Sequence, residues 1–287
     1  MIIKPEYRVK EENGFTLFQA ALWILFSIIV VTGSLSLGWY YYVHFVSQRN
    51  RSESFLITGL LLQPIGNEKL PGSYIAELLE LSVDKPVNIY RFQTKEALEK
   101  LQNSFHIKYA EIDRVKPGYL WVAYEVREPV ALLENYENQA IDQFGEVFPY
   151  LPFYKGRNLP KVYFDLPRGD YSYVASLEFK QEAKQNLQLL EVIKVLEIDG
   201  WKISRVDFSK QNALSFGQRQ IIVQLAKNAA AQEHFLRFSP DQLPESLHNY
   251  QKLQKSLQSE RLYSENSLII DLRIPQLAYI SVKKEAP

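Results

Sequence analysis

Residues 15–43 read FTLFQAALWILFSIIVVTGSLSLGWYYYV and contain no charged residue. A helix rises by about 1.5 Å per residue, so about 20 apolar residues cross the hydrocarbon core of a bilayer. The run ends in a cluster of aromatic residues of the kind found at headgroup level, Trp39, Tyr40, Tyr41 and Tyr42. No second run of this kind occurs in the chain. The sequence therefore predicts a short tail over residues 1–14 and a membrane-spanning helix over residues 15–46.

Two other interpretations of this run fit it less well. A cleaved signal peptide has a shorter apolar core, of about 7–15 residues, and a buried helix of a soluble domain would show a polar face, which this run lacks. Three basic residues precede the run and two follow it. This excess of one favours a cytoplasmic tail only slightly. The chain has no cysteine, which suits a compartment where thiols would be oxidised.

The remaining residues have the composition of a soluble, globular protein. The chain is 46% hydrophobic and its formal net charge is zero, whereas a nucleic-acid-binding protein would show a basic excess. Its four histidines lack metal-ligand spacing, and no phosphate-binding glycine loop or G-x-S-x-G nucleophile elbow occurs. We therefore expect no nucleic acid, cofactor or metal as a ligand, and no enzymatic activity.

Residues 47–131 contain the pattern of a small α+β module. A short strand is predicted at residues 55–57, broken by Gly59, and helical spacing is present over residues 73–81 and again after Thr94, which is a suitable cap. Two strands follow around the turn at residues 116–118, and the second has apolar residues at every other position from Leu120 to Val126. The predicted order is β-α-α-β-β, with two helices on one face of a small sheet.

Residues 132–287 are richer in predicted strands. Apolar stripes predict one helix over residues 177–198 and a second beginning near Pro244. We expect these two helices to cover an antiparallel sheet, which makes the fold class of the whole chain α+β.

The last predicted strand, over residues 276–283, is a candidate partner-binding edge. Its apolar and polar residues alternate after Pro275, and the residues considered for binding are Leu277, Ala278, Tyr279, Ile280, Ser281 and Val282. A terminal strand leaves a row of unpaired backbone groups. Two interpretations stay open: Lys283 and Lys284 protect a solvated edge, or a partner adds a strand there.

Two segments carry a resemblance to a known family. Residues 107–120 read IKYAEIDRVKPGYL, in which Ala110, Arg114 and Pro117 match the pattern V/I-x-x-A-x-V-x-R-x-x-P-x-x-L. Residues 126–131 read VREPVA, in which Arg127 and Pro129 match the pattern E-R-x-P-x-A. These patterns are those of the POTRA domain in the FtsQ/DivIB family of bacterial cell-division proteins, which this chain resembles.

Further motifs follow in the family's order. Asp142 and Gly145 fit its D-x-x-G-x-V/F pattern, Leu159-Pro160 resembles its LP step, and Asp271 and Arg273 belong to a DLR motif before the last strand. Val126 replaces the family's usual Glu, and His106 replaces a usual Pro. The resemblance spans the chain, with a tail, an anchor, a POTRA domain at residues 47–131 and an FtsQ-type β-domain at residues 132–287.

The resemblance implies a non-enzymatic scaffold of the division septum in the bacterial cytoplasmic (inner) membrane. Its tail would be cytoplasmic and its two domains extracytoplasmic, that is, periplasmic. It would link early division proteins to FtsB and FtsL, and through them to septal peptidoglycan synthesis, with FtsB beside the last strand. The alternatives are a membrane-anchored extracytoplasmic cell-wall enzyme or sensor, and an outer-membrane assembly protein, which would have several POTRA repeats and a barrel.

Overall fold

The structure, a computed structural model of the chain, describes residues 17–166, 171–227, 232–257 and 267–283. The predicted tail at residues 1–14 lies outside these described residues. The chain divides into two compact units, which are described separately. One unit comprises Met1–Leu61, Leu81–Thr94 and Asp113–Trp121, and the other comprises Leu62–Glu80, Lys95–Ile112 and Val122–Pro287. The predicted domain boundary between residues 131 and 132 stays a prediction.

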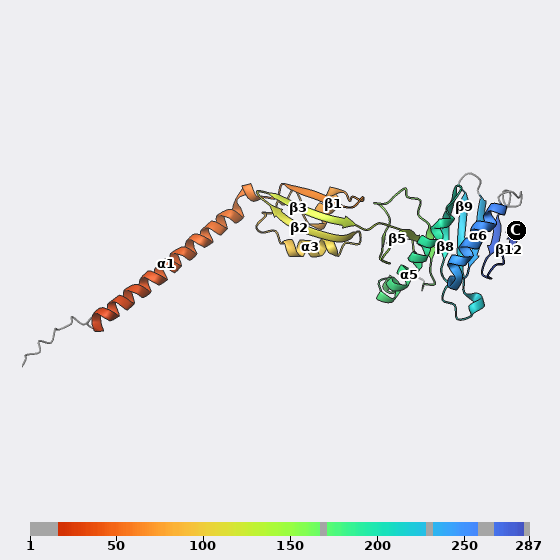
Figure 1. The fold of residues 1–287 in the computed structure, drawn as a ribbon. Coiled ribbons are helices and arrows are strands. Elements are labelled where there is room, and N and C mark those ends of the chain that lie inside the picture. The colour runs from red at the N-terminus through yellow and green to blue at the C-terminus, as the bar shows by residue number, and fades with distance from the viewer. Residues whose placement is uncertain (1–16, 167–170, 228–231, 258–266, 284–287) are drawn as a thin grey trace, which may run out of the picture. The chain divides into compact units, whose positions relative to one another are not determined.

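Helix α1, Leu17–Arg51, is the long helix at the start of the described chain (Figure 1). None of its residues is buried, and it is long and apolar enough to cross a membrane. It extends past the predicted end at residue 46 and has Arg49 and Arg51 in its last turn. Cationic side chains at this end interact favourably with the partial negative charge of the helix C-terminus.

Replacement of Ile28 by Arg tests whether α1 is a membrane anchor. Ile28 lies midway along the charge-free run and is 56% exposed. A charge near the bilayer centre costs about 2.5–3.5 kcal/mol on insertion scales. We expect carbonate extraction of membranes to release more of the Ile28→Arg variant than of the parent chain, with Ile28→Leu as the matched control. Identical fractionation of all three chains would argue against a transmembrane α1.

A three-stranded sheet with two short helices follows α1. Its elements, in chain order, are β1 (Gly59–Ile65), α2 (Gly72–Leu78), α3 (Thr94–Gln102), β2 (Ile107–Val115) and β3 (Tyr119–Val126). The strands lie in the order β1-β3-β2. The predicted β-α-α-β-β order is confirmed, and the alternating residues of β3 are buried, namely Leu120, Val122, Tyr124 and Val126.

The first strand of this sheet begins later than predicted. Glu53–Phe55 forms a 3-10 turn, η1, and Leu56 makes only an isolated bridge with Asn88. Strand β1 instead starts at Gly59, the residue predicted to break the strand. A Cβ atom at residue 59 would lie 3.1 Å from the ring of Tyr119, so glycine here permits the close approach of that ring.

A nine-stranded sheet dominates the rest of the chain. Its strands lie in the order β12-β11-β10-β9-β8-β7-β4-β5-β6. In chain order they are β4 (Ala131–Leu133), β5 (Gln139–Ile141), β6 (Val147–Pro149), β7 (Lys161–Tyr163), β8 (Trp201–Asp207), β9 (Ile221–Lys227), β10 (Gln232–Phe238), β11 (Leu268–Asp271) and β12 (Tyr279–Val282).

The sheet is mixed, so the prediction of an antiparallel sheet is wrong. Strand β7 is parallel to both β4 and β8, and β10 is parallel to β11. Between β7 and β8 the chain forms helices α4 (Tyr171–Val174) and α5 (Leu177–Ile193), and between β10 and β11 it forms α6 (Leu243–Leu257). A helix in the connection carries the chain back to the starting edge, so the next strand runs parallel to the last one.

Helices α5 and α6 lie along the nine-stranded sheet (Figure 1). They share one hydrophobic core with the strands, to which α5 contributes Phe179, Leu187 and Leu190 and α6 contributes Leu247 and Tyr250. Ser176 caps α5 by accepting a hydrogen bond from the backbone N–H of Phe179 at 3.1 Å. The predicted helical stripe therefore forms the core, although α5 ends at Ile193 and continues as a 3-10 turn, η2 (Lys194–Leu196).

Candidate functional site

Strand β12 is the edge of the nine-stranded sheet. It pairs with β11 on one side, and no strand in the described part of the chain pairs with its other side. The backbone N–H of Lys283 donates to the carbonyl oxygen of Ser267 at 2.8 Å, which continues the β11–β12 ladder. Because backbone groups alternate in direction along an antiparallel strand, the N–H and C=O groups of Ile280 and Val282 point to the open edge.

The predicted strand is longer than the observed one. A turn carries Gln276 at a φ of 59°. In the same turn the N–H of Leu277 donates to the carbonyl oxygen of Ile274 at 3.2 Å, so β12 begins only at Tyr279. Ala278 and Ile280 pack against the core, as their alternation predicts. Tyr279 is 70% exposed and Leu277 is 57% exposed, so both present apolar surface beside the open edge.

Lys283 does not lie along this open edge. Its ammonium nitrogen is 4.2 Å from the ring centroid of Phe235 and 3.7 Å from the Glu233 carboxylate. Both residues belong to β10, two strands away from β12. The side chain therefore lies back across the sheet, and Lys284 lies outside the described residues.

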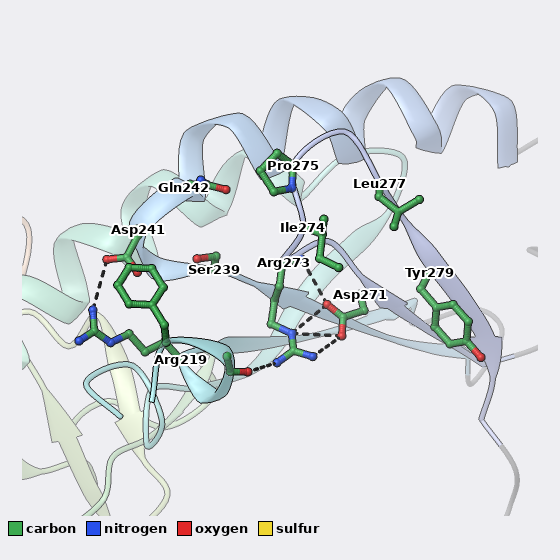
Figure 2. Close-up of a pocket in the computed structure, with 12 residues that line it drawn as sticks. Arg219, Ser239, Asp241, Gln242, Asp271, Arg273, Ile274, Pro275, Leu277 and Tyr279 are labelled. Atoms are coloured by element: carbon green, nitrogen blue, oxygen red, sulfur yellow. Dashed lines mark hydrogen bonds and ion pairs between the residues drawn. The ribbon is translucent and has the colours of Figure 1, made fainter. Parts of the chain in front are cut away.

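A cavity of about 640 Å³ adjoins the start of β12 (Figure 2). Its wall is formed by the turn before β12, by the 3-10 turn η3 (Phe216–Gln218) between β8 and β9, and by the 3-10 turn η4 (Pro240–Gln242) before α6. The apolar lining residues are Phe216, Ile274, Pro275, Leu277 and Tyr279. Strand β12 thus presents an open backbone edge next to a cavity with apolar walls.

The charged residues of the DLR motif line this cavity. The Arg273 guanidinium donates to both carboxylate oxygens of Asp271, at 2.7–3.1 Å, and to the carbonyl oxygen of Gly217 at 3.0 Å (Figure 2). Burial by itself raises the pKa of Asp271, but hydrogen bonds from Arg273 and the charges of Arg273 and Arg237 outweigh it, so the pKa lies below its ordinary value. The pKa of Arg273 is raised, chiefly by its hydrogen bond to Asp271. The pair joins the turn before β12 to η3.

Replacement of Asp271 by Asn tests this pair. A carboxylate whose folded-state pKa is depressed stabilises the fold above its ordinary pKa of about 3.9 and loses that contribution as the pH falls through the folded-state value. We expect Asp271→Asn to lower the free energy of unfolding by about 1–3 kcal/mol at neutral pH and by progressively less in acid.

Urea unfolding of the full chain in detergent, followed by tryptophan fluorescence, measures this. Asp84→Asn, an exposed loop carboxylate, is the matched control. A destabilisation by Asp271→Asn that stays constant down to acidic pH would contradict the assignment.

A second arginine, absent from the sequence predictions, lies at this cavity. Arg219 is 3.7 Å from the Asp241 carboxylate, donates to the carbonyl oxygen of Ala213 at 2.9 Å, and has its guanidinium 4.8 Å from the ring centroid of Phe216. These residues come from segments on either side of β9 and β10. No spacing in the sequence connects these residues. The order of the strands brings them to the cavity that Asp271 and Arg273 also line.

Arg127, Asp142 and Gly145 form a second group of motif residues. The Arg127 guanidinium donates to the Asp142 carboxylate at 3.0 Å, and the Asp142 side chain is only 3% exposed. The same carboxylate accepts the backbone N–H groups of Phe144 and Glu146, at 2.9 and 3.0 Å, which closes the turn around Gly145. Gly145 has a φ of 82°, and a Cβ there would lie 2.5 Å from the carbonyl oxygen of Lys180.

Two glycine variants separate the cost of a left-handed backbone from the cost of a steric clash with Lys180. Gly156 also has a left-handed φ, of 93°, but nothing lies within 4 Å of a Cβ built there. We expect Gly156→Ala to lower the free energy of unfolding by about 1–2 kcal/mol and Gly145→Ala by at least about 1 kcal/mol more, because α5 must move. Thermal unfolding of the full chain in detergent measures both, and equal losses would show that the approach to Lys180 carries no cost.

The remaining motif residues have structural positions. Ala110 is buried in β2, Pro117 lies in the β2–β3 turn, and Pro129 is buried just before β4. The Arg114 guanidinium donates to the carbonyl oxygen of Phe92. Most residues of the resemblance therefore fall into three places: the three-stranded sheet, the Arg127–Asp142 turn and the cavity beside β12. Pro129 instead precedes β4, and Leu159-Pro160 precedes β7.

The arrangement at β12 is suited to binding. Its charged side chains are paired with each other, and its exposed groups are backbone donors, backbone acceptors and apolar side chains. Such a surface fits an extended peptide that adds a strand and places one side chain in the cavity. No family model matches the chain, and no curated protein matches it in sequence.

Proposed function

We propose that this chain is a single-pass, non-enzymatic division scaffold of the FtsQ/DivIB type. In this proposal α1 anchors the chain in the bacterial cytoplasmic membrane, residues 47–131 form a POTRA domain, and residues 132–287 form the partner-binding domain. The soluble part lies outside the cytoplasm at the division septum. It holds the FtsB–FtsL pair and through that pair connects early division proteins to septal peptidoglycan synthesis.

The open edge of β12 is the observation that carries the proposal. Ile280 and Val282 direct backbone donors and acceptors outward, and Tyr279 stands exposed beside a cavity of about 640 Å³. Strand addition draws its affinity from backbone hydrogen bonds and its specificity from side-chain pockets. An exposed tyrosine is a typical energetic centre of such an interface. The resemblance assigns the FtsB contact to this same strand.

Two further observations support the proposal. The β-α-α-β-β order of residues 59–126 is the order that the resemblance implies for a POTRA domain. Motif residues that lie apart in the sequence also meet in space, since Arg127 binds Asp142 across a separation of 15 positions. A chance match of isolated motifs gives no reason for such a pairing.

Three variants of β12 test the proposal. Val282→Pro removes an N–H group that points to the open edge. The ladder to β11 stays intact, because proline is tolerated in an edge strand where the N–H of that residue points away from the neighbouring strand. Val282→Ala keeps that N–H and is the matched control. We expect Val282→Pro and Tyr279→Ala each to weaken capture of the FtsB–FtsL pair by the full chain about 30-fold or more, and Val282→Ala to bind like the parent.

Two controls complete this experiment. Tyr109→Ala removes an exposed tyrosine of β2 and should leave capture unchanged. A fluorescent fusion of the parent chain should gather at the septum of dividing cells. Uniform membrane fluorescence, or undiminished capture by Val282→Pro and Tyr279→Ala together, would refute the proposal.

A further inference from the structure

The loops around the end of α1 carry an excess of basic residues, which we call the basic face. Residues 44–61, 81–94 and 113–121 belong to one compact unit with α1 and carry six basic residues, Arg49, Arg51, Lys85, Arg91, Arg114 and Lys116, against three acidic ones. The soluble residues outside this unit carry more acidic than basic residues. The chain is neutral as a whole, but its positive charge is concentrated where α1 ends.

Hydrogen bonds hold these loops against the end of α1. The Asn88 amide donates to the carbonyl oxygens of Arg49 and Ser52, at 3.1 and 3.3 Å. The Arg49 guanidinium lies 4.0 Å from the ring centroid of Tyr90. The loop at residues 81–94 is therefore fixed to the last turn of the helix, rather than joined to it by a free linker.

The β2–β3 turn is held at the same place. The N–H of Thr58 donates to the carbonyl oxygen of Gly118 at 2.8 Å, and the N–H of Ile57 donates to that of Val87 at 2.9 Å. A Cβ on Gly118 would lie 2.2 Å from the carbonyl oxygen of Leu56, so only glycine allows this approach. Lys116 and Arg114 are thereby brought to the end of the sheet where α1 joins it.

The charges on this face are available to an outside partner. Arg51, Lys85, Arg91 and Lys116 are exposed, and none of the four forms an ion pair with a carboxylate of the described residues. Val83, in the same loop as Lys85, is 97% exposed. Exposed cations around an apolar tip are typical of surfaces that meet anionic lipid.

The length of α1 places this face near the bilayer. The aromatic cluster at residues 39–42 marks the headgroup level, and the helix continues as far as Arg51. Nine residues of helix place the end of α1 about 14 Å beyond the headgroup level. Long Lys and Arg side chains and a modest tilt of the helix reduce the distance between the charged groups and the headgroups. The charges therefore lie within about one Debye length of the headgroups, about 8–10 Å at ordinary salt.

From these observations we infer that the face formed by Arg51, Lys85, Arg91, Arg114 and Lys116 binds the anionic phospholipid headgroups of the leaflet from which α1 emerges. The contact holds these loops against the membrane and, because they are fixed to the last turn of α1, limits the tilt of α1 in the bilayer. The inference rests on α1 crossing the bilayer and is independent of any role in division.

A single fluorescent label tests this directly. The chain has no cysteine, so Val83→Cys provides one labelling site. The full chain is placed in nanodiscs of phosphatidylcholine alone, or of phosphatidylcholine mixed equally with phosphatidylglycerol, with a headgroup-attached quencher. We expect stronger quenching with phosphatidylglycerol, and loss of that increase between about 0.1 and 1 M salt, where the Debye length falls from about 10 to 3 Å.

Charge-neutralised variants locate the contact. Each Lys or Arg near an anionic surface favours the bound state by about five-fold. Lys85→Gln, Arg91→Gln and Lys116→Gln combined should therefore shift the equilibrium about a hundred-fold towards the state in which these loops do not contact the headgroups. Lys155→Gln, Lys184→Gln and Lys252→Gln, three exposed lysines of the other unit, are the matched control and should quench like the parent.

Three results would overturn the inference. Equal quenching in both lipid mixtures would show that the basic face does not bind anionic lipid, and an acidic protein or polymer would then be its candidate partner. Unchanged quenching in the first triple variant would show that these charges do not make the contact. Failure of the chain to enter nanodiscs would remove the premise that α1 crosses the bilayer.

Discussion

Helix α1 has apolar side chains around its whole circumference, and nothing in the described chain covers them. Apolar surface exposed to water costs about 25 cal/mol per Å², so the length and composition of this helix suit a lipid environment. The elements that follow α1 are joined directly to its last turn. The end of α1 is fixed by Asn88 and Tyr90 to the loops of the three-stranded sheet. If α1 crosses a bilayer as proposed, these contacts keep the loops that follow it close to the membrane surface.

The far part of the chain is organised by its strand connections. Crossovers through α5 and α6 make the nine-stranded sheet mixed and place β12 at its edge. A sheet that ends in an open strand must be protected or used. Here Lys283 lies across the sheet over Phe235, and Tyr279 and Leu277 expose apolar surface beside a cavity. These features leave the edge accessible, and they are the physical basis of the proposed strand addition.

Local patterns predicted most elements correctly. The β-α-α-β-β order, the inward alternation from Leu120 to Val126 and the core stripe of α5 follow from the spacing of apolar residues. The errors occur where a distant contact overrides a local signal. Gly59 has the local character of a strand breaker but is the first residue of β1, where the lack of a side chain leaves room for the Tyr119 ring. The antiparallel sheet was a wrong prediction because strand pairing depends on where a crossover returns the chain, and spacing along one segment does not encode that.

Sequence alone determined the long apolar helix at the start of the described chain, the order of the helices and strands from β1 to β3, and the motif of Asp271 and Arg273 before the last strand. Each depends on residues within a few turns of one another. Only the tertiary structure decided that Arg219, Asp241 and Phe216 stand with this motif around one cavity. It also decided that Lys85, Arg91 and Lys116 gather at the end of α1. These groups come from separate loops, and their meeting follows from sheet order and loop hydrogen bonds, which act between residues far apart in the chain.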